Sequence, residues 1–194
     1  MIESNKDYKY YLYCDKIALG KNYNRPKFFG DEIWKFEILM RKTEYFVNCS
    51  NNFFTKLYSK VLKYLYHKKS IKLNFSIPLN VFGPGLSIAH YGTIVVNSNA
   101  KVGKNCRIQE CTTIGGTNGS FYAPILGDNI FIGSGARIIG NITIANDIAI
   151  GANALVNKSF IKNGITIAGV PAKEISSKNS HSNLNKLLEK NNLL

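Results

Sequence analysis

The sequence predicts a mainly β chain, built as a solenoid of short strands, with an α-helical N-terminal region and a short C-terminal helix or tail. Three observations support this. Aliphatic residues recur every six positions between residues 96 and 156, aromatic residues concentrate in residues 1–75 with helical spacing, and residues 176–194 are polar and then leucine-rich. These changes in chemistry divide the chain into residues 1–75, 76–175 and 176–194.

The six-residue period fits neither an α-helix nor a simple alternating strand. A short fixed period is typical of a solenoid, and six residues suffice for one short strand and a turn. Three such units close a triangular coil, in which each inward aliphatic side chain stacks on its equivalent about 4.8 Å away in the next coil. The positions in register are Val96, Val102, Ile108, Ile114, Leu126, Ile132, Ile138, Ile144, Ile150 and Val156.

The repeat is interrupted once, at "GGTNGSFYAP", residues 115–124, where Ser120 occupies the register position. Since the register resumes afterwards, we expect a loop that leaves the coil, and loops held by a rigid scaffold often carry binding groups. The repeat ends near residues 165–175, where Pro171 stops the ladder.

Two helices are expected in the N-terminal region. Residues 32–47 form the first, with Asp31 as N-cap. The second begins after Asn51 or Asn52, and its apolar stripe recurs every four residues from Phe53 to Tyr66. We expect this stripe to pack in the core. The alternative is a helix on a membrane surface, because lysines adjoin the aromatic face.

The composition, 45% hydrophobic and 19% charged, is that of a folded protein. No apolar run approaches the roughly 20 residues that span a bilayer, and the N-terminus lacks the apolar core of a signal peptide, so a cytoplasmic location is expected. The four cysteines have no CxxC spacing and are expected to be reduced. The net charge of +13 suits an anionic partner such as a phosphorylated cofactor. No nucleic-acid motif accompanies it.

The hexads, "TIGGT" at residues 113–117 and "AGVPAK" at residues 168–173 resemble the left-handed β-helix (hexapeptide-repeat) acyltransferases, and among them the serine acetyltransferases. The resemblance covers roughly residues 30–175 and is strongest to the shorter relatives found with bacterial surface-polysaccharide genes. It implies a left-handed parallel β-helix and a homotrimer with active sites between subunits. The implied reaction is acetyl transfer from acetyl-CoA to a hydroxyl, without a metal.

The resemblance also implies roles for individual residues. The family's catalytic histidine falls on His90 in "IAHYGTIVV", and a histidine with an ordinary pKa can take the hydroxyl proton as general base. Gly116 and Thr117 are candidates to line the thioester end or to stabilise the oxyanion. The remaining expected contacts with CoA are Ser134, Ala152, Lys158 and Lys173.

Several positions depart from the serine acetyltransferase pattern. Ala89 stands where an aspartate directly precedes the catalytic histidine, Ala123 and Tyr122 stand where a histidine and an arginine help to bind serine, and Ser98 replaces a glutamate. We therefore expect a sugar hydroxyl in surface-polysaccharide synthesis as acceptor, with Tyr91, Tyr122 and Ala123 beside it. Serine is the alternative. A backbone carbonyl, Glu110 or a neighbouring subunit could orient His90.

Other interpretations of the histidines remain open at this stage. His90 lies six positions before Val96, so strict register would point its ring into the coil unless the register breaks near Gly92. His67 and His181 are expected to be solvated. Zinc enzymes with a β-helix need three converging histidines, and the coil holds only one. A non-catalytic scaffold that uses the basic N-terminal helices on a membrane is a further alternative.

Overall fold

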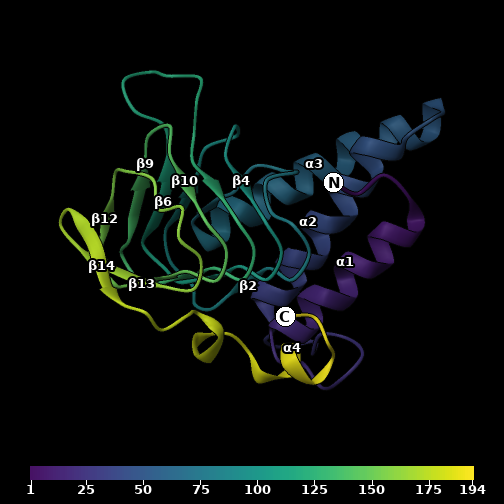
Figure 1. The fold of residues 1–194 in the computed structure, drawn as a ribbon. Coiled ribbons are helices and arrows are strands. Elements are labelled where there is room, and N and C mark those ends of the chain that lie inside the picture. Colours follow the sequence, from purple (N-terminus) through teal and green to yellow (C-terminus); the bar gives the residue numbers. More distant parts are fainter.

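The computed structural model describes residues 1–194 and consists of a β-coil with three helices packed at its N-terminal end (Figure 1). The helices are Asn5–Ala18 (α1), Glu32–Cys49 (α2), Phe53–Leu73 (α3) and Lys186–Lys190 (α4), with a 3-10 turn at His181–Asn183 (η1). The short helix α4 lies beside the C-terminal end of α1, so the C-terminal segment returns to the N-terminal region.

Three parallel sheets form the sides of the coil, which confirms the predicted fold class. Sheet A contains β1 (Phe75–Ser76), β3 (Ile94–Val96), β6 (Thr112–Gly115), β9 (Arg137–Ile139) and β12 (Leu155–Val156). Sheet B contains β4 (Lys101–Val102), β7 (Ile125–Leu126) and β10 (Thr143–Ile144). Sheet C contains β2 (Ser87–Ile88), β5 (Arg107–Ile108), β8 (Phe131–Ile132), β11 (Ala149–Ile150), β13 (Thr166–Gly169) and the antiparallel β14 (Ala172–Ser176).

The hexad positions form the core of the coil, as predicted. Ile108, Ile132 and Ile150 stack on one another in sheet C, and all three are fully buried. The expected loop at residues 115–124 leaves the coil between β6 and β7 and projects beyond it (Figure 1). The register is kept across this loop, because Leu126 pairs with Val102.

The first coil contains a second departure from the period. Ile88, rather than His90, is the partner of Ile108, and eight positions instead of six separate Ile88 from Val96. The two additional residues lie in the turn between β2 and β3. This places His90 outside the inward register, and its side chain is exposed. The interior-histidine interpretation is therefore wrong.

A polar ladder runs along the corner between sheets B and C. Asn105, Asn129 and Asp147 all have positive φ, a conformation that asparagine and aspartate tolerate well. Asn105 Nδ2 donates to Asn129 Oδ1 and Asn129 Nδ2 donates to Asp147 Oδ1, both at 2.8 Å. His181 Nε2 lies 2.8 Å from the same Asp147 oxygen. The expectation that His181 is solvated is therefore wrong, because it ties the C-terminal segment to this ladder.

The helix caps differ from the prediction at one of two positions. Asn52 forms a capping box with Thr55 at the start of α3, as expected. Asp31 occupies the N-cap position of α2 but makes no capping hydrogen bond, because its carboxylate is engaged elsewhere. It accepts from Lys21 Nζ at 2.5 Å, from the Tyr23 hydroxyl at 2.7 Å and from Lys27 N at 3.0 Å. Asp31 thus holds the segment between α1 and α2.

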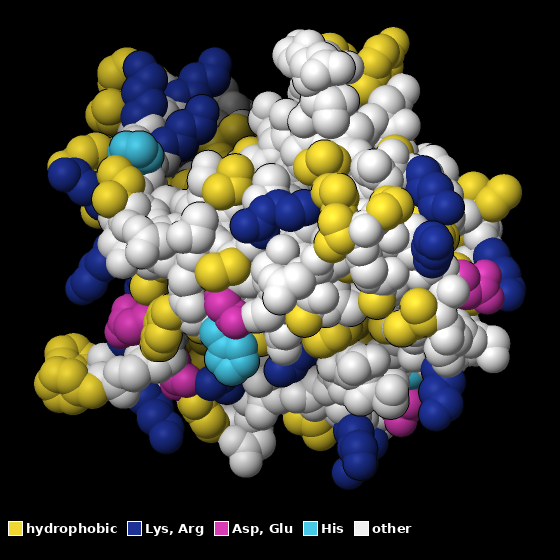
Figure 2. Space-filling view, turned by 90° about the vertical axis from the view of Figure 1, so that its left-hand side faces the viewer, with side chains coloured by type: hydrophobic (Ala, Val, Ile, Leu, Met, Phe, Trp, Pro, Cys, Tyr) yellow, Lys and Arg dark blue, Asp and Glu magenta, His cyan; other side chains and the backbone are white.

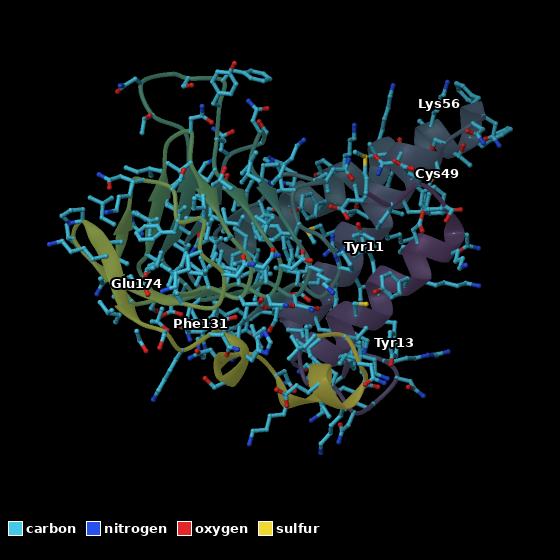
Figure 3. All side chains as sticks on the ribbon, viewed as in Figure 1. Tyr11, Tyr13, Cys49, Lys56, Phe131 and Glu174 are labelled. Carbon is cyan, nitrogen blue, oxygen red and sulfur yellow. The ribbon has the colours of Figure 1, made fainter.

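The apolar stripe of α3 does not pack in the core along most of its length, contrary to the prediction. Leu62 and Tyr66 are buried, whereas Phe53 and Phe54 remain 73% and 79% exposed and Leu57 is 51% exposed. The first turns of α3 extend away from the coil, and Lys56 marks this end in Figure 3. No helix of the chain combines the length and the apolar character needed to cross a membrane.

Buried charged residues join α1 and α2 to the first coil. Asp15 Oδ1 accepts from Gly85 N and Leu86 N at 2.8 and 2.9 Å. Arg41 donates to Asp15, to Glu44 and to the carbonyl oxygens of Phe82 and Gly83. The first coil lies at the end of the β-helix, where no further strand is present to pair with its backbone. The side chains of Asp15 and Arg41 therefore satisfy backbone groups that would otherwise be buried without partners.

Glu37 completes this cluster and supports the strand that leads to His90. Its Oε1 accepts from Ile88 N at 3.0 Å, while its Oε2 is buried without a hydrogen-bond partner. Burial raises the pKa of Glu37 well above its ordinary value, and the negative charge of Asp15 acts in the same direction. Because the unfolded chain ionises this carboxyl at lower pH than the folded chain does, stability is lost as pH rises above the unfolded value.

Replacing Glu37 with glutamine is expected to remove this loss, because glutamine cannot ionise and its carbonyl can still accept from Ile88. The melting temperature of E37Q relative to the wild type should increase as pH rises above 4.5, the ordinary pKa of this carboxyl. Thermal unfolding followed by circular dichroism measures this difference, with the exposed Glu189→Gln as the matched control. A difference that stays constant with pH would contradict the assignment.

The C-terminal segment folds back onto the same chain. Leu184 and Leu188 are buried against Ile17 and Ala18 of α1, with Phe131 of β8 packed alongside. The Tyr13 hydroxyl donates to Asn191 Oδ1 at 3.0 Å, and Asn105 Nδ2 donates to the Leu193 carbonyl at 2.7 Å. Tyr13 and Phe131 mark the two ends of this contact in Figure 3. The segment therefore covers part of the outer face of sheet C.

Candidate active site

His90 lies at the corner of the coil where sheet C passes into sheet A. It follows β2, and equivalent corner positions follow β5, β8, β11 and β13 in the successive coils. Backbone hydrogen bonds connect these corners, from Ala89 N to Ile108 O and from Gln109 N to Ile132 O. Further along, Gly133 N donates to Ile150 O and Gly151 N to Ile167 O. We call this line of turns the C/A corner.

Gly92 allows the turn that carries His90 to lie against the next coil. Its φ is +136°, which a residue with a side chain rarely adopts. A Cβ on this residue would lie 2.9 Å from the Cβ of Glu110. The glycine in "HYG" is therefore required both by its backbone conformation and by close contact with Glu110.

Glu110 occupies the C/A corner one coil beyond His90. The Ser134 hydroxyl donates to Glu110 Oε1, and Glu110 Oε2 is buried without a partner. The hydrogen bond from Ser134 lowers the pKa of Glu110 below its usual value, and the charge of His90 adds to this effect. An ionised carboxylate thus lies within electrostatic reach of the imidazole, without a hydrogen bond between the two side chains.

Ser134, Ala152 and Lys173 follow His90 along the same corner. Both backbone polar groups of Ser134 are engaged, because its N–H donates to Gln109 Oε1 and its carbonyl accepts from Asn153 N. The N–H of Ala152 has no hydrogen-bond partner, and the residue is exposed. Lys173 is exposed and pairs with Ala168 across the β13–β14 hairpin. Five strand spacings separate β2, which His90 follows, from β14, which carries Lys173. They correspond to about 24 Å.

Gly116, Thr117 and Lys158 lie at a different corner, where sheet A passes into sheet B. Gly116 and Thr117 directly follow β6, and Lys158 follows β12 in the same sheet. Gly140 follows β9 at the same corner. A Cβ added to Gly140 would lie 3.9 Å from Thr117 Oγ1. Sheet A separates this A/B corner from His90. One chain therefore holds the predicted CoA residues as two separate groups.

The side chains expected to contact the acceptor are also dispersed. Phe121 and Tyr122, at the end of the projecting loop, are 76% and 63% exposed. Ala123 is only 5% exposed and belongs to the core of the coil, so the expectation that it lines an acceptor surface is not met. Tyr91 is exposed beside His90. Of these residues, only Tyr91 shares a surface with His90 in one chain.

A cavity of about 300 Å³ opens beside His90, between the N-terminal region and the first coils. Its wall includes Ser87–Tyr91 from the coil and Asp31–Trp34 from the start of α2. Lys21 and Arg107 supply its positive charges. Pockets for small ligands begin at about this volume. The C/A corner thus provides an exposed imidazole at the mouth of a polar cavity.

The sequence does not predict the N-terminal wall of this cavity or the place of Arg107 in it. Asp31 has the pattern of a helix cap, and Lys21 lies in a segment without a recognised motif. A signal was available for Arg107, since it directly precedes the hexad residue Ile108 and occupies an outward strand position. The cavity itself depends on how the helices pack against the coil, which the local sequence pattern does not specify.

No protein-family model matches the chain. A serine acetyltransferase from Buchnera aphidicola is 35% identical over 126 residues, which cover 61% of this chain and 48% of that protein. One from Helicobacter pylori is 37% identical over 97 residues, covering 48% of this chain and 56% of that protein. The chain thus spans about half the length of the curated relatives it matches.

Solved structures extend the similarity to nearly the whole chain. A serine acetyltransferase from Brucella abortus matches with a TM-score of 0.71 and 25% identity, covering 92% of this chain and 73% of that one. A structure of serine acetyltransferase from the same organism in complex with coenzyme A gives a TM-score of 0.67 at 25% identity, covering 92% of this chain and 71% of that one. The left-handed β-helix, the hexads and these relatives together support the placement of this chain in the hexapeptide-repeat acyltransferase superfamily.

Proposed function

We propose that the chain is an acetyl-CoA-dependent O-acetyltransferase in which His90 is the general base. The observation that carries this proposal is the C/A corner. An exposed histidine lies at one end, a free backbone N–H at Ala152 follows, and a lysine lies five strand spacings, about 24 Å, from the strand that carries the histidine. An extended thiol cofactor with a phosphorylated end fits such a line. The coenzyme A complex of the Brucella abortus relative adds support.

The chemistry follows from the residues at this corner. His90 takes the proton of an acceptor hydroxyl as the oxygen attacks the thioester carbonyl, and returns it to the departing thiolate. The tetrahedral oxyanion requires a hydrogen-bond donor, for which the N–H groups of Gly116 and Thr117 are candidates. The charge of Glu110 stabilises the protonated form of the imidazole. Holding both reactants at one corner contributes much of the rate through proximity.

The active unit in this proposal is a homotrimer, or another assembly in which neighbouring coils meet. His90 and the Gly116–Thr117 turn lie at opposite ends of sheet A, so one chain cannot place both beside the same thioester. A neighbouring coil packed side by side can bring its A/B corner to the C/A corner of the first. Basic side chains outnumber acidic ones on the face at the β12–β14 end (Figure 2), which suits the phosphates of CoA.

The proposed acceptor is L-serine, because the relatives bear the name serine acetyltransferase. This reverses the preference for a sugar that the sequence suggested. The carbohydrate acceptor stays as the second candidate on one observation. Ala89 and Tyr122 stand where the family has charged groups for serine, and the exposed rings of Phe121 and Tyr122 could stack on a sugar.

Acetyl transfer by the purified chain tests the proposal. The protein is incubated with acetyl-CoA and either L-serine or a panel of sugars, free thiol is measured, and products are identified by mass spectrometry. O-Acetylserine as the main product would support the first candidate, and acetylated sugar the second. Absence of both CoA binding and acceptor-dependent thiol release would overturn the proposed activity.

A further inference from the structure

Arg107 lies on the outer face of sheet C, within the wall of the cavity beside His90. Its strand neighbours on the same face are Ser87 in the coil before and Phe131 in the coil after. Neither side chain carries a charge. The Arg107 side chain is partly buried, between this sheet and the segment that leads into α2.

The guanidinium of Arg107 has no partner within the chain. Neither a side-chain hydrogen bond nor an ion pair involves it, whereas the other arginine in a buried setting, Arg41, makes five hydrogen bonds. An arginine presents five donors in a rigid fork that matches a carboxylate or a phosphate. A partly buried fork that no other group of the chain engages keeps these donors available to a ligand in the cavity.

The carboxylates of the same cavity are already neutralised. Asp31 is paired with Lys21 at 2.5 Å and also accepts from Tyr23 and from the backbone of Lys27. Glu32 is paired with Lys35 at 2.8 Å and with Lys69 at 3.1 Å. Since each acid in the wall has its own lysine, Arg107 is the unbalanced charge that faces the cavity. The cavity therefore favours an anion.

We infer that Arg107 binds an oxyanion of the acceptor, a carboxylate or a phosphate, and thereby presents the acceptor hydroxyl to His90. This inference rests on the proposed acetyl transfer and specifies its substrate class: the acceptor carries a negative group near the reacting hydroxyl. L-Serine meets this requirement through its carboxylate, and a sugar phosphate meets it through its phosphate. Neutral sugars and neutral amino-acid derivatives do not.

Two acceptor pairs and two variants test the inference. L-Serine is compared with L-serinamide, and glucose 1-phosphate with glucose, in the wild type, in Arg107→Gln and in Arg107→Lys. For whichever of the two anionic acceptors the wild type acetylates, R107Q should lower kcat/KM by about 10- to 100-fold. The KM for acetyl-CoA should stay within about twofold of the wild type. R107K keeps the charge but loses the fork, so its loss should be smaller.

A matched control removes a positive charge outside the cavity. Lys101 is exposed on β4, in sheet B, and Lys101→Gln should leave the acceptor kcat/KM unchanged. Preference for serine over glucose 1-phosphate, or the reverse, identifies which oxyanion the site takes. Wild-type turnover of a neutral acceptor as fast as of its anionic counterpart would overturn the inference, while the acetyl transfer itself would stand.

A binding measurement keeps the test independent of turnover. Calorimetric titration of L-serine, L-serinamide, glucose 1-phosphate and glucose into the CoA-saturated protein gives their dissociation constants. An anion that binds more tightly than its neutral counterpart in the wild type but not in R107Q supports the inference. Wild-type protein that binds neither anion more tightly than its neutral counterpart overturns it. Absence of CoA binding in the same experiment would instead count against the proposed function.

Discussion

Replacing His90 with alanine should lower the rate of acetyl transfer by about a hundredfold or more. The imidazole is exposed at the C/A corner, beside the cavity and within electrostatic reach of Glu110. Alanine removes the only group at this corner whose ordinary pKa lets it accept a proton near neutral pH. Binding of CoA should persist, because the residues proposed to contact it remain in place.

The measurement is single-turnover acetyl transfer, with CoA binding followed separately by calorimetry. His67→Ala serves as the matched control, since His67 is exposed on α3 and lies at neither corner. Both variants should keep the circular dichroism spectrum and the oligomer size of the wild type, because neither side chain is part of the core. An H90A protein that transfers acetyl at the wild-type rate would eliminate the general-base role.

Replacing Arg41 with leucine should lower the free energy of unfolding by about 3–5 kcal/mol. Arg41 is completely buried, and its guanidinium lies 2.7 Å from Asp15 and 3.0 Å from Glu44. Burial lowers the pKa of Arg41, but the charges of the two carboxylates outweigh this effect and hold the pKa above its ordinary value. Leucine would remove the positive charge that compensates both buried carboxylates, and the guanidinium that donates to the carbonyl oxygens of Phe82 and Gly83.

Denaturant unfolding measured by circular dichroism checks this value. The exposed Arg25→Leu is the matched control and should change stability by only a few tenths of a kcal/mol. Arg41→Lys should fall between the two, because an ammonium keeps the charge but cannot reach both carboxylates and both carbonyls. An R41L protein within about 1 kcal/mol of the wild type would show that the cluster contributes little to folding.

The fold was predictable because its core residues recur at a fixed spacing in the sequence. A six-residue period leaves one geometric solution, and Ile108, Ile132 and Ile150 stack as the period requires. The periodicity of the sequence predicted α2 and α3 but not their burial, and α1 was not predicted. Phe53 and Phe54 show the same spacing as Leu62 and Tyr66, yet only the latter pair are buried. Spacing defines a face, and only tertiary packing decides what covers it.

The candidate site was predictable only in part, for a similar reason. His90 was found through its resemblance to a motif, whereas the turn that exposes it depends on two additional residues between Ile88 and Val96. The cavity draws Asp31, Trp34 and Arg107 from segments far apart in the sequence. Asp31 could not be assigned from its neighbours, because its partners Lys21 and Tyr23 meet it only after the segment between α1 and α2 folds.

The cluster of Asp15, Glu37, Arg41 and Glu44 also restricts how copies of this chain can associate. A β-coil is a template for its own extension, because its terminal strands offer unpaired N–H and C=O groups to another coil. Here the cluster saturates the backbone of Asn80, Gly85, Leu86 and Ile88 at that end. Head-to-tail stacking of coils through this edge is therefore disfavoured. The flanks of the coil stay available for the side-by-side association proposed above.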